Sequence, residues 1–166
     1  MHQIKHVLDK LLETVTAAVM GLLLLDVVWQ VITRFVLRDP SNWTEELATF
    51  LLIWVGLLGA AVALNRRAHL GIDFFVLKFR GVKLLLTELL IALCIIGFAV
   101  SVLLVGGIQL VTLTFKLGQT APATGIALGY VYLAVPISGF FITMYGFAFL
   151  NEAIRNYKNT NNALQG

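Results

Sequence analysis

The sequence predicts an all-α membrane protein in which four transmembrane helices carry almost the whole chain, with both termini in the cytoplasm. Of its 166 residues, 59% are hydrophobic and 13% are charged, and the mean hydropathy is +0.89. Soluble domains hold about 45–50% apolar residues. Four apolar runs, each long enough to approach the roughly 30 Å hydrocarbon core of a bilayer, are separated by short polar segments. We therefore expect a single membrane domain over 1–166.

The distribution of basic residues predicts the orientation of these helices. Cytoplasmic loops retain Lys and Arg. With both termini inside, nine of the twelve basic residues fall on the cytoplasmic side: two before the first helix, five in the central loop and two in the tail. The net charge of +3 follows from this topology, so nucleic acid is not expected as a partner. Cys94 is the single cysteine and forms no disulfide within the chain.

The first helix is expected at about 12–37, after a short cytoplasmic lead over residues 1–13. Asp26, Gln30 and Arg34 recur every four residues and form a polar stripe on one helix face. A carboxylate inside the membrane is costly unless it has a partner. We favour a structural contact of Asp26 with a neighbouring helix or a partner protein over ion coupling or snorkelling to the interface. Arg34 is a candidate contact with a partner.

The second helix, at about 44–65, has an acidic start and a basic end. Trp43 is placed to anchor it at the membrane interface. Glu45 and Glu46 occupy its start, where the helix dipole favours negative charge. Adjacent helical residues point about 100° apart, so the two carboxylates do not converge on a catalytic or cation site. We expect them to contact another subunit.

Small residues mark one face of this second helix. Gly56, Ala60 and Ala63 recur at i, i+4 and i+7 within the 18 uncharged residues 47–64. Small residues at this spacing let another backbone approach closely, which is how helices associate in lipid. This face is therefore a candidate contact with a partner.

The central loop contains a segment at about 69–80 that is apolar but too short to cross the membrane. It is expected to lie in the headgroup plane as an amphipathic segment. His69 and Asp73 would be one turn apart if this segment is helical. A local hydrogen bond that shapes the turn is expected there, rather than metal binding or a proton relay.

The third and fourth helices are expected at about 84–115 and 125–150. The third contains 27 consecutive uncharged residues and exceeds the bilayer core, so it should tilt, bend or project. The fourth begins with Gly125 and Gly129 in a GxxxG pattern, a further candidate contact with a partner. Pro136 is expected to kink it, and the tail 155–166 is expected to be disordered.

Missing motifs exclude most functions. The three histidines lie outside the spans, so they cannot ligate a haem there. The sequence has no phosphate-binding loop, Cys/His metal cluster, Ser/His/Asp set or internal repeat. We expect no enzyme activity, metal or cofactor, and interpret the chain as an accessory or scaffold subunit. The alternative is a self-sufficient four-helix proton-coupled exporter that uses Asp26; Gln30 and Arg34 beside it, and the long basic loop, argue against this.

Several runs of residues resemble a known family. Their order and spacing are similar to the small membrane subunit, the DctQ-like small permease, of tripartite ATP-independent periplasmic (TRAP) transporters. The runs are Trp43-Thr-Glu45-Glu46, Trp54-Val-Gly-Leu-Leu-Gly59-Ala-Ala, Arg67-Ala-His69-Leu-Gly-Ile-Asp73, Pro122-Ala-Thr-Gly125-Ile and Val131-Tyr132-Leu-Ala-Val-Pro136. Ala127, where the family pattern has a second proline, and Gly129-Tyr130, where it has an aromatic pair, depart from it.

This resemblance implies a multi-pass subunit of the bacterial inner membrane, surrounded by lipid. It implies two protein partners, a large many-helix transport subunit and a periplasmic substrate-binding protein. The large subunit would hold the Na⁺ and substrate sites, so neither is expected in this chain. The substrates implied are carboxylates, of the C4-dicarboxylate or sialic acid class.

Overall fold

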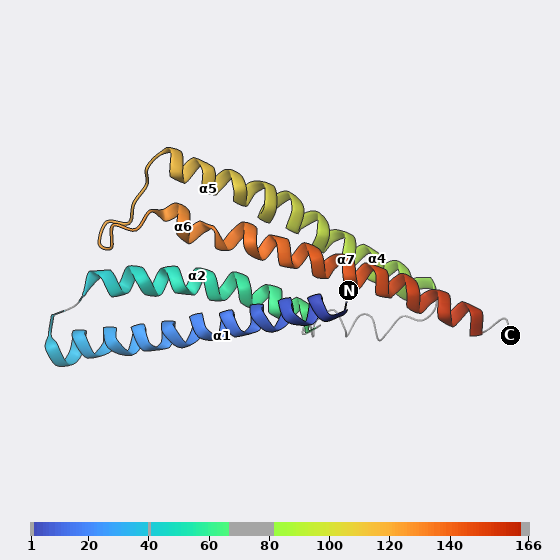
Figure 1. Cartoon of the computed structure of the whole chain (residues 1–166), viewed down its shortest axis with the longest axis horizontal. Helices are drawn as coiled ribbons and strands as arrows, with labels where there is room; N and C mark the ends of the chain where they lie inside the picture. Colours follow the sequence, from blue (N-terminus) through green and yellow to red (C-terminus); the bar gives the residue numbers. More distant parts are fainter. Residues whose placement is uncertain (1, 40, 67–81, 164–166) are drawn as a thin grey trace.

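The chain folds into two antiparallel helical hairpins (Figure 1), as seen in a computed structural model that describes residues 2–39, 41–66 and 82–163. Within those residues, four helices are long and apolar enough to cross a bilayer: His6–Leu37, Asn42–Asn65, Leu85–Lys116 and Leu128–Arg155. The predicted fold class and number of spans are confirmed. The end of the first span, the start of the second and the connection 117–127 lie at one end of the bundle. We call this the outer end, and the opposite one the inner end, following the orientation that the basic residues predict.

The first hairpin consists of α1 (His2–Ile32), a π-helical turn η1 (Thr33–Leu37) and α2 (Asn42–Asn65). The turn ends at Arg38, whose φ of 56° lies in the left-handed region. The backbone N–H groups of Arg38 and Asp39 both donate to the carbonyl of Thr33. A left-handed residue that satisfies a terminal carbonyl is a common way to end a helix, and here it allows α2 to begin within a few residues.

The first helix begins earlier than predicted. Residues 1–13 were expected to form a short lead, but α1 is helical from His2. The physical reason is tertiary contact: Asp9, within the extra turns, accepts a hydrogen bond from the hydroxyl of Tyr145 at 2.7 Å. Leu12, at the predicted start of the helix, is 3% exposed and lies in a buried cluster with Leu58, Ala61 and Tyr145.

The second hairpin begins with three consecutive helical segments: α4 (Val82–Phe98), the π-helical η2 (Ala99–Gly106) and α5 (Gly107–Lys116). After the connection 117–127, the chain returns through α6 (Leu128–Tyr132) and α7 (Ala134–Ala163). In the packed bundle, α2 lies between α1 and α7, while α4 and η2 pack against the other side of α7.

The fourth span differs from the prediction in three ways. It begins at Leu128 instead of 125, because Gly125 has a φ of 68° and belongs to the preceding turn. The predicted kink at Pro136 takes the form of a break at Leu133: Pro136 has no N–H to donate to the carbonyl of Tyr132, where α6 ends, and lies in the first turn of α7. The helix continues to Ala163, so the prediction of a disordered tail from 155 is wrong as far as that residue.

Candidate functional site

One face of α2 is left uncovered along the whole span. Glu45, Thr49, Leu52, Gly56 and Ala60 are all exposed. Their spacing of four, three, four and four residues places them on one side of the helix. Ala63 continues this line toward the inner end and is partly buried. We call these six residues the α2 face; it contains four of the residues predicted to contact a partner, namely Glu45, Gly56, Ala60 and Ala63.

The α2 face is poor in the large apolar side chains that cover the other membrane-facing surfaces. Among the residues of α2, only Trp43 and Leu52 are large hydrophobics with substantial exposure. In contrast, α1 and η1 expose such side chains along their length, from Val7 and Leu11 to Phe35 and Leu37. Large aliphatic side chains are suited to lipid, whereas small residues favour contact with another helix.

Two kinds of glycine occur within the spans that the structure describes. A Cβ atom on Gly139 would lie 2.7 Å from Leu103 Cβ, and one on Gly146 would lie 2.7 Å from Ile96 Cγ1, so both glycines are needed where α7 packs against η2 and α4. A Cβ atom on Gly56 or Gly59 would meet nothing within 4 Å. Close packing within the described chain therefore explains Gly139 and Gly146. It does not explain Gly56 and Gly59 of α2.

The GxxxG prediction at the start of the fourth helix is wrong in its geometry. Gly125 lies in the turn before α6, so it does not share a helix face with Gly129. A Cβ atom on Gly129 would lie 2.5 Å from the ring of Phe115, which itself packs edge-to-face on Tyr130. Gly129 is thus used for packing within this chain, and neither glycine presents the predicted helix-contact surface.

The two adjacent glutamates of α2 have different surroundings. Glu45 is exposed on the α2 face. The carboxylate of Glu46 accepts the backbone N–H groups of Ala123 and Thr124, both at 2.9 Å, and the hydroxyl of Thr124 at 2.9 Å. We predicted both residues as contacts with another subunit, but Glu46 makes its contact within the chain.

The remaining predicted residues of the outer half are placed as follows. Arg34 is exposed on η1, and Trp43 is about half exposed at the start of α2. Asp26 is 8% exposed on α1, and its Oδ2 atom has no hydrogen-bond partner among the described residues. Because α1 packs along α2, the burial of Asp26 is consistent with a place inside the first hairpin, whereas Arg34, two turns further on, is exposed.

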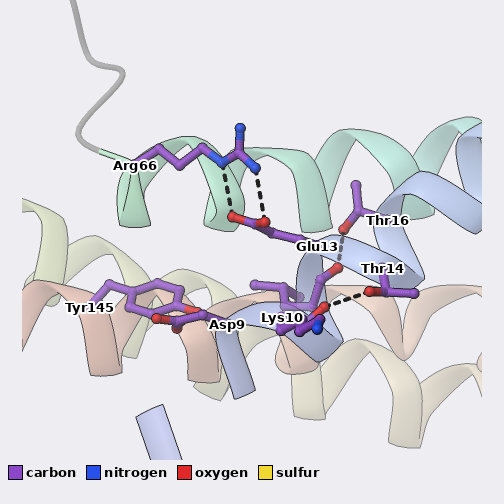
Figure 2. A network of polar contacts seen from close by, with 8 residues as sticks. Asp9, Lys10, Glu13, Thr14, Thr16, Arg66 and Tyr145 are labelled. Carbon is purple, nitrogen blue, oxygen red and sulfur yellow. Dashed lines mark hydrogen bonds and ion pairs between the residues drawn. The ribbon is translucent and has the colours of Figure 1, made fainter. Parts of the chain in front are cut away.

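Polar contacts at the inner end, which the sequence did not reveal, join three helices (Figure 2). Glu13 of α1 forms an ion pair with Arg66, at 2.8 Å between Oε2 and the guanidinium and 2.9 Å between Oε1 and Nε. The hydrogen bond that Arg66 donates to Glu13, together with the charge of that carboxylate, raises the pKa of Arg66, so this side chain stays charged. The hydroxyl of Tyr145 on α7 donates to Asp9 on α1 at 2.7 Å. These partners are far apart in sequence, so no local pattern could have indicated them.

Two further predictions concern the central loop and metal binding. The amphipathic segment 69–80, with His69 and Asp73, lies outside the described residues. Within the described part of the chain, no group of three or more His, Cys, Asp or Glu residues could hold a metal ion.

Comparison with known proteins identifies the family. Residues 23–156 match the model of the DctQ component of tripartite ATP-independent periplasmic transporters. The chain is 37% identical over 75 residues to a sialic acid TRAP transporter small permease protein of Vibrio cholerae; this match covers 45% of the chain and 43% of that relative. It is 24% identical over 147 residues to a putative TRAP transporter small permease protein of Haemophilus influenzae, covering 86% of the chain and 87% of the relative.

A third relative is much longer than this chain. The chain is 35% identical over 89 residues to a sialic acid TRAP transporter permease protein of Haemophilus influenzae, covering 51% of the chain but 14% of that relative. Small permeases of this type are transporter components and not enzymes. The family match and the four apolar helices together show that this chain is a multi-pass protein of the bacterial inner membrane and belongs to the DctQ component family of TRAP transporters.

Proposed function

We propose that this chain is the static scaffold subunit of a Na⁺-coupled importer of carboxylates, and that it binds the large transport subunit through the α2 face. The observation that carries the proposal is this uncovered face of small residues, which the packing of the described chain does not use. Such a surface is expected where a second protein completes the helix packing.

The composition of the spans supports a scaffold role. Residues 47–64 and 89–115 contain no charged residue, and residues 14–33 contain only Asp26. A solute-binding site near the middle of a membrane protein needs polar groups or helix ends that point at the solute. This chain supplies few of either, so the site for substrate and Na⁺ belongs in the partner.

The longer relatives support the choice of partner. A region similar to this chain makes up only 14% of the Haemophilus influenzae sialic acid TRAP transporter permease protein. It makes up 15% of the isethionate TRAP transporter permease protein of Oleidesulfovibrio alaskensis, at 27% identity over 100 residues. Where one polypeptide carries both regions, the two are expected to work together, and we propose the corresponding large transport region as the partner of this chain.

The names of two small-permease relatives support the substrate class. The Vibrio cholerae relative is named for sialic acid, and a second small permease from that species, 29% identical over 96 residues, is named for C4-dicarboxylates. Sialic acids and dicarboxylates share a carboxylate group. We therefore propose a carboxylate as substrate, delivered by a soluble periplasmic binding protein.

Co-purification tests whether the α2 face binds the large subunit. With Gly56→Leu and Ala60→Leu combined, the added side chains keep a partner helix at a distance, so we expect the large subunit to be lost from an affinity-purified complex. Gly97→Leu is the matched control, because Gly97 is also exposed and a Cβ atom there also meets nothing within 4 Å. Full retention of the large subunit by the double variant would show that the α2 face does not contact it.

Transport in liposomes tests the function itself. We expect uptake of radiolabelled sialic acid or succinate, driven by a sodium gradient, only when this chain, the large subunit and the binding protein are all present. Uptake by this chain alone would support the alternative of a self-sufficient transporter. Asp26 would then be its first candidate residue, since it is the buried carboxylate of the first span.

A further inference from the structure

Two polar contacts join the hairpins, and they lie at opposite ends of the molecule. At the outer end, the carboxylate of Glu46 on α2 accepts the N–H groups of Ala123 and Thr124 and the hydroxyl of Thr124, each at 2.9 Å. At the inner end, the hydroxyl of Tyr145 on α7 donates to the carboxylate of Asp9 on α1 at 2.7 Å (Figure 2). Hydrogen bonds to an ionised acceptor are stronger than those between neutral groups.

The outer contact places the connection 117–127 against α2. The connection folds through its own backbone, since the N–H of Ala121 donates to the carbonyl of Ile126 at 2.9 Å within the turn. This bond does not involve Glu46. The carboxylate of Glu46 therefore decides where the folded turn lies against the first hairpin, and not whether the turn forms.

The inner contact links two helices that are not neighbours along their length. Among the described residues, α1 packs along α2 but not along α7. The side chain of Tyr145 is 3% exposed and lies in a cluster with Leu12 of α1 and with Leu58 and Ala61 of α2. It thus reaches from the second hairpin across the end of α2 to the far helix of the first hairpin.

The apolar surfaces between the hairpins orient them only weakly. Residues 47–64 of α2 carry no charge, and in lipid an apolar helix gains little from exchanging one apolar surrounding for another, so association depends on close packing and polar contacts. A single polar contact leaves a pivot. Glu46 and Leu58, the α2 neighbour of Tyr145, are 12 positions apart, which is about 18 Å at the helical rise of 1.5 Å per residue. Two contacts at this separation fix the angle between the hairpins.

We propose that Glu46 and Tyr145 are positioning residues that fix this angle, so that the two hairpins form one rigid body in the membrane. The inference deepens the proposed function and rests on it where transport is concerned, because a static scaffold has to keep its shape while the transport subunit moves against it. Neither residue belongs to the α2 face. Both act through the placement of helices and not through contact with the large subunit.

Distances between spin labels, measured by pulsed electron paramagnetic resonance on the full chain in lipid nanodiscs, test the inference. The labels are attached to cysteines in a Cys94→Ser background. Phe35→Cys with Leu113→Cys reports on the outer end, and Val7→Cys with Leu86→Cys reports on the inner end. All four positions are exposed, and each pair has one label on each hairpin.

Each variant should act at its own end. Glu46→Gln replaces one acceptor oxygen by an amide group that cannot accept from an N–H, so only the outer distance distribution should broaden. Tyr145→Phe keeps the ring and removes the hydroxyl, so only the inner distribution should broaden. A reference pair within the second hairpin, Val105→Cys with Phe140→Cys, should keep its width in both variants, whereas broadening of all three pairs would show a general loss of structure and overturn the inference.

Matched controls remove similar groups that make neither contact. Asp39→Asn changes an exposed acid of the outer end, and Tyr130→Phe removes the hydroxyl of an exposed tyrosine. Both should leave every distribution unchanged. Wild-type widths at both ends in the double variant, Glu46→Gln with Tyr145→Phe, would also overturn the inference.

Sodium-driven uptake in liposomes tests the consequence for transport. We expect the double variant to co-purify with the large subunit and to support slower uptake than the wild type. Uptake at the wild-type rate, although the distances have broadened, would show that transport does not need the fixed angle. If the wild-type complex shows no uptake, the proposed function itself fails, while the spin-label distances still decide whether Glu46 and Tyr145 hold the hairpins together.

Discussion

Tyr145 is the residue through which α7 reaches α1 at the inner end. Its ring is buried with Leu12 and Leu58, and its hydroxyl donates to Asp9 at 2.7 Å. Tyr145→Phe removes the donor and keeps the packing, so we expect the free energy of unfolding to fall by about 1 kcal/mol. Thermal unfolding of the purified chain in detergent would measure this change.

A substitution of Glu13, at the same end of the molecule, is the control for Tyr145→Phe. Glu13→Gln removes the ion pair with Arg66, whose side chain is 63% exposed. Exposed ion pairs contribute little because water and salt screen them. The melting temperature should therefore fall less than in Tyr145→Phe. A larger fall would contradict the claim that the hydrogen bond of Tyr145 stabilises the fold more than the ion pair of Glu13.

At the scale of elements, the contact of α7 with η2 depends on glycine. A Cβ atom on Gly139 would lie 2.7 Å from Leu103 Cβ and 3.1 Å from the backbone carbon of Leu103. Gly139→Ala should therefore destabilise the fold, by the roughly 1–3 kcal/mol typical of overpacking. Gly97→Ala, at an open position of α4, should be neutral or slightly stabilising, because Ala favours a helix over Gly. Equal melting temperatures of the two variants would refute the tight packing.

At the scale of the whole molecule, the orientation in the membrane remains a prediction from the basic residues. Cysteine labelling of spheroplasts would test it, in a Cys94→Ser background because Cys94 is a free and exposed thiol. Thr120→Cys, on the outer connection, should react with a membrane-impermeant maleimide. His6→Cys, at the inner end of α1, should react only after the membrane is permeabilised. The reverse pattern would place both termini outside.

The sequence by itself determined the number of spans and, through its motifs, the family. Charged residues are costly inside lipid and are rare in transmembrane helices. Long uncharged runs such as 47–64 and 89–115 therefore indicate such helices. The ends of the helices were less predictable. The contact of Asp9 with Tyr145 stabilises the additional turns of α1, and the turn at Gly125 delayed the start of the fourth span.

Only the tertiary structure decided which similar residues serve the fold and which are free for a partner. Gly56 and Gly139 look alike in the sequence, yet only Gly139 has a close neighbour within the chain. Glu45 and Glu46 are adjacent acids, yet one is exposed and the other bonds to Ala123 and Thr124. The physical reason is that neighbouring helical residues point about 100° apart, so their surroundings depend on helices from distant parts of the chain.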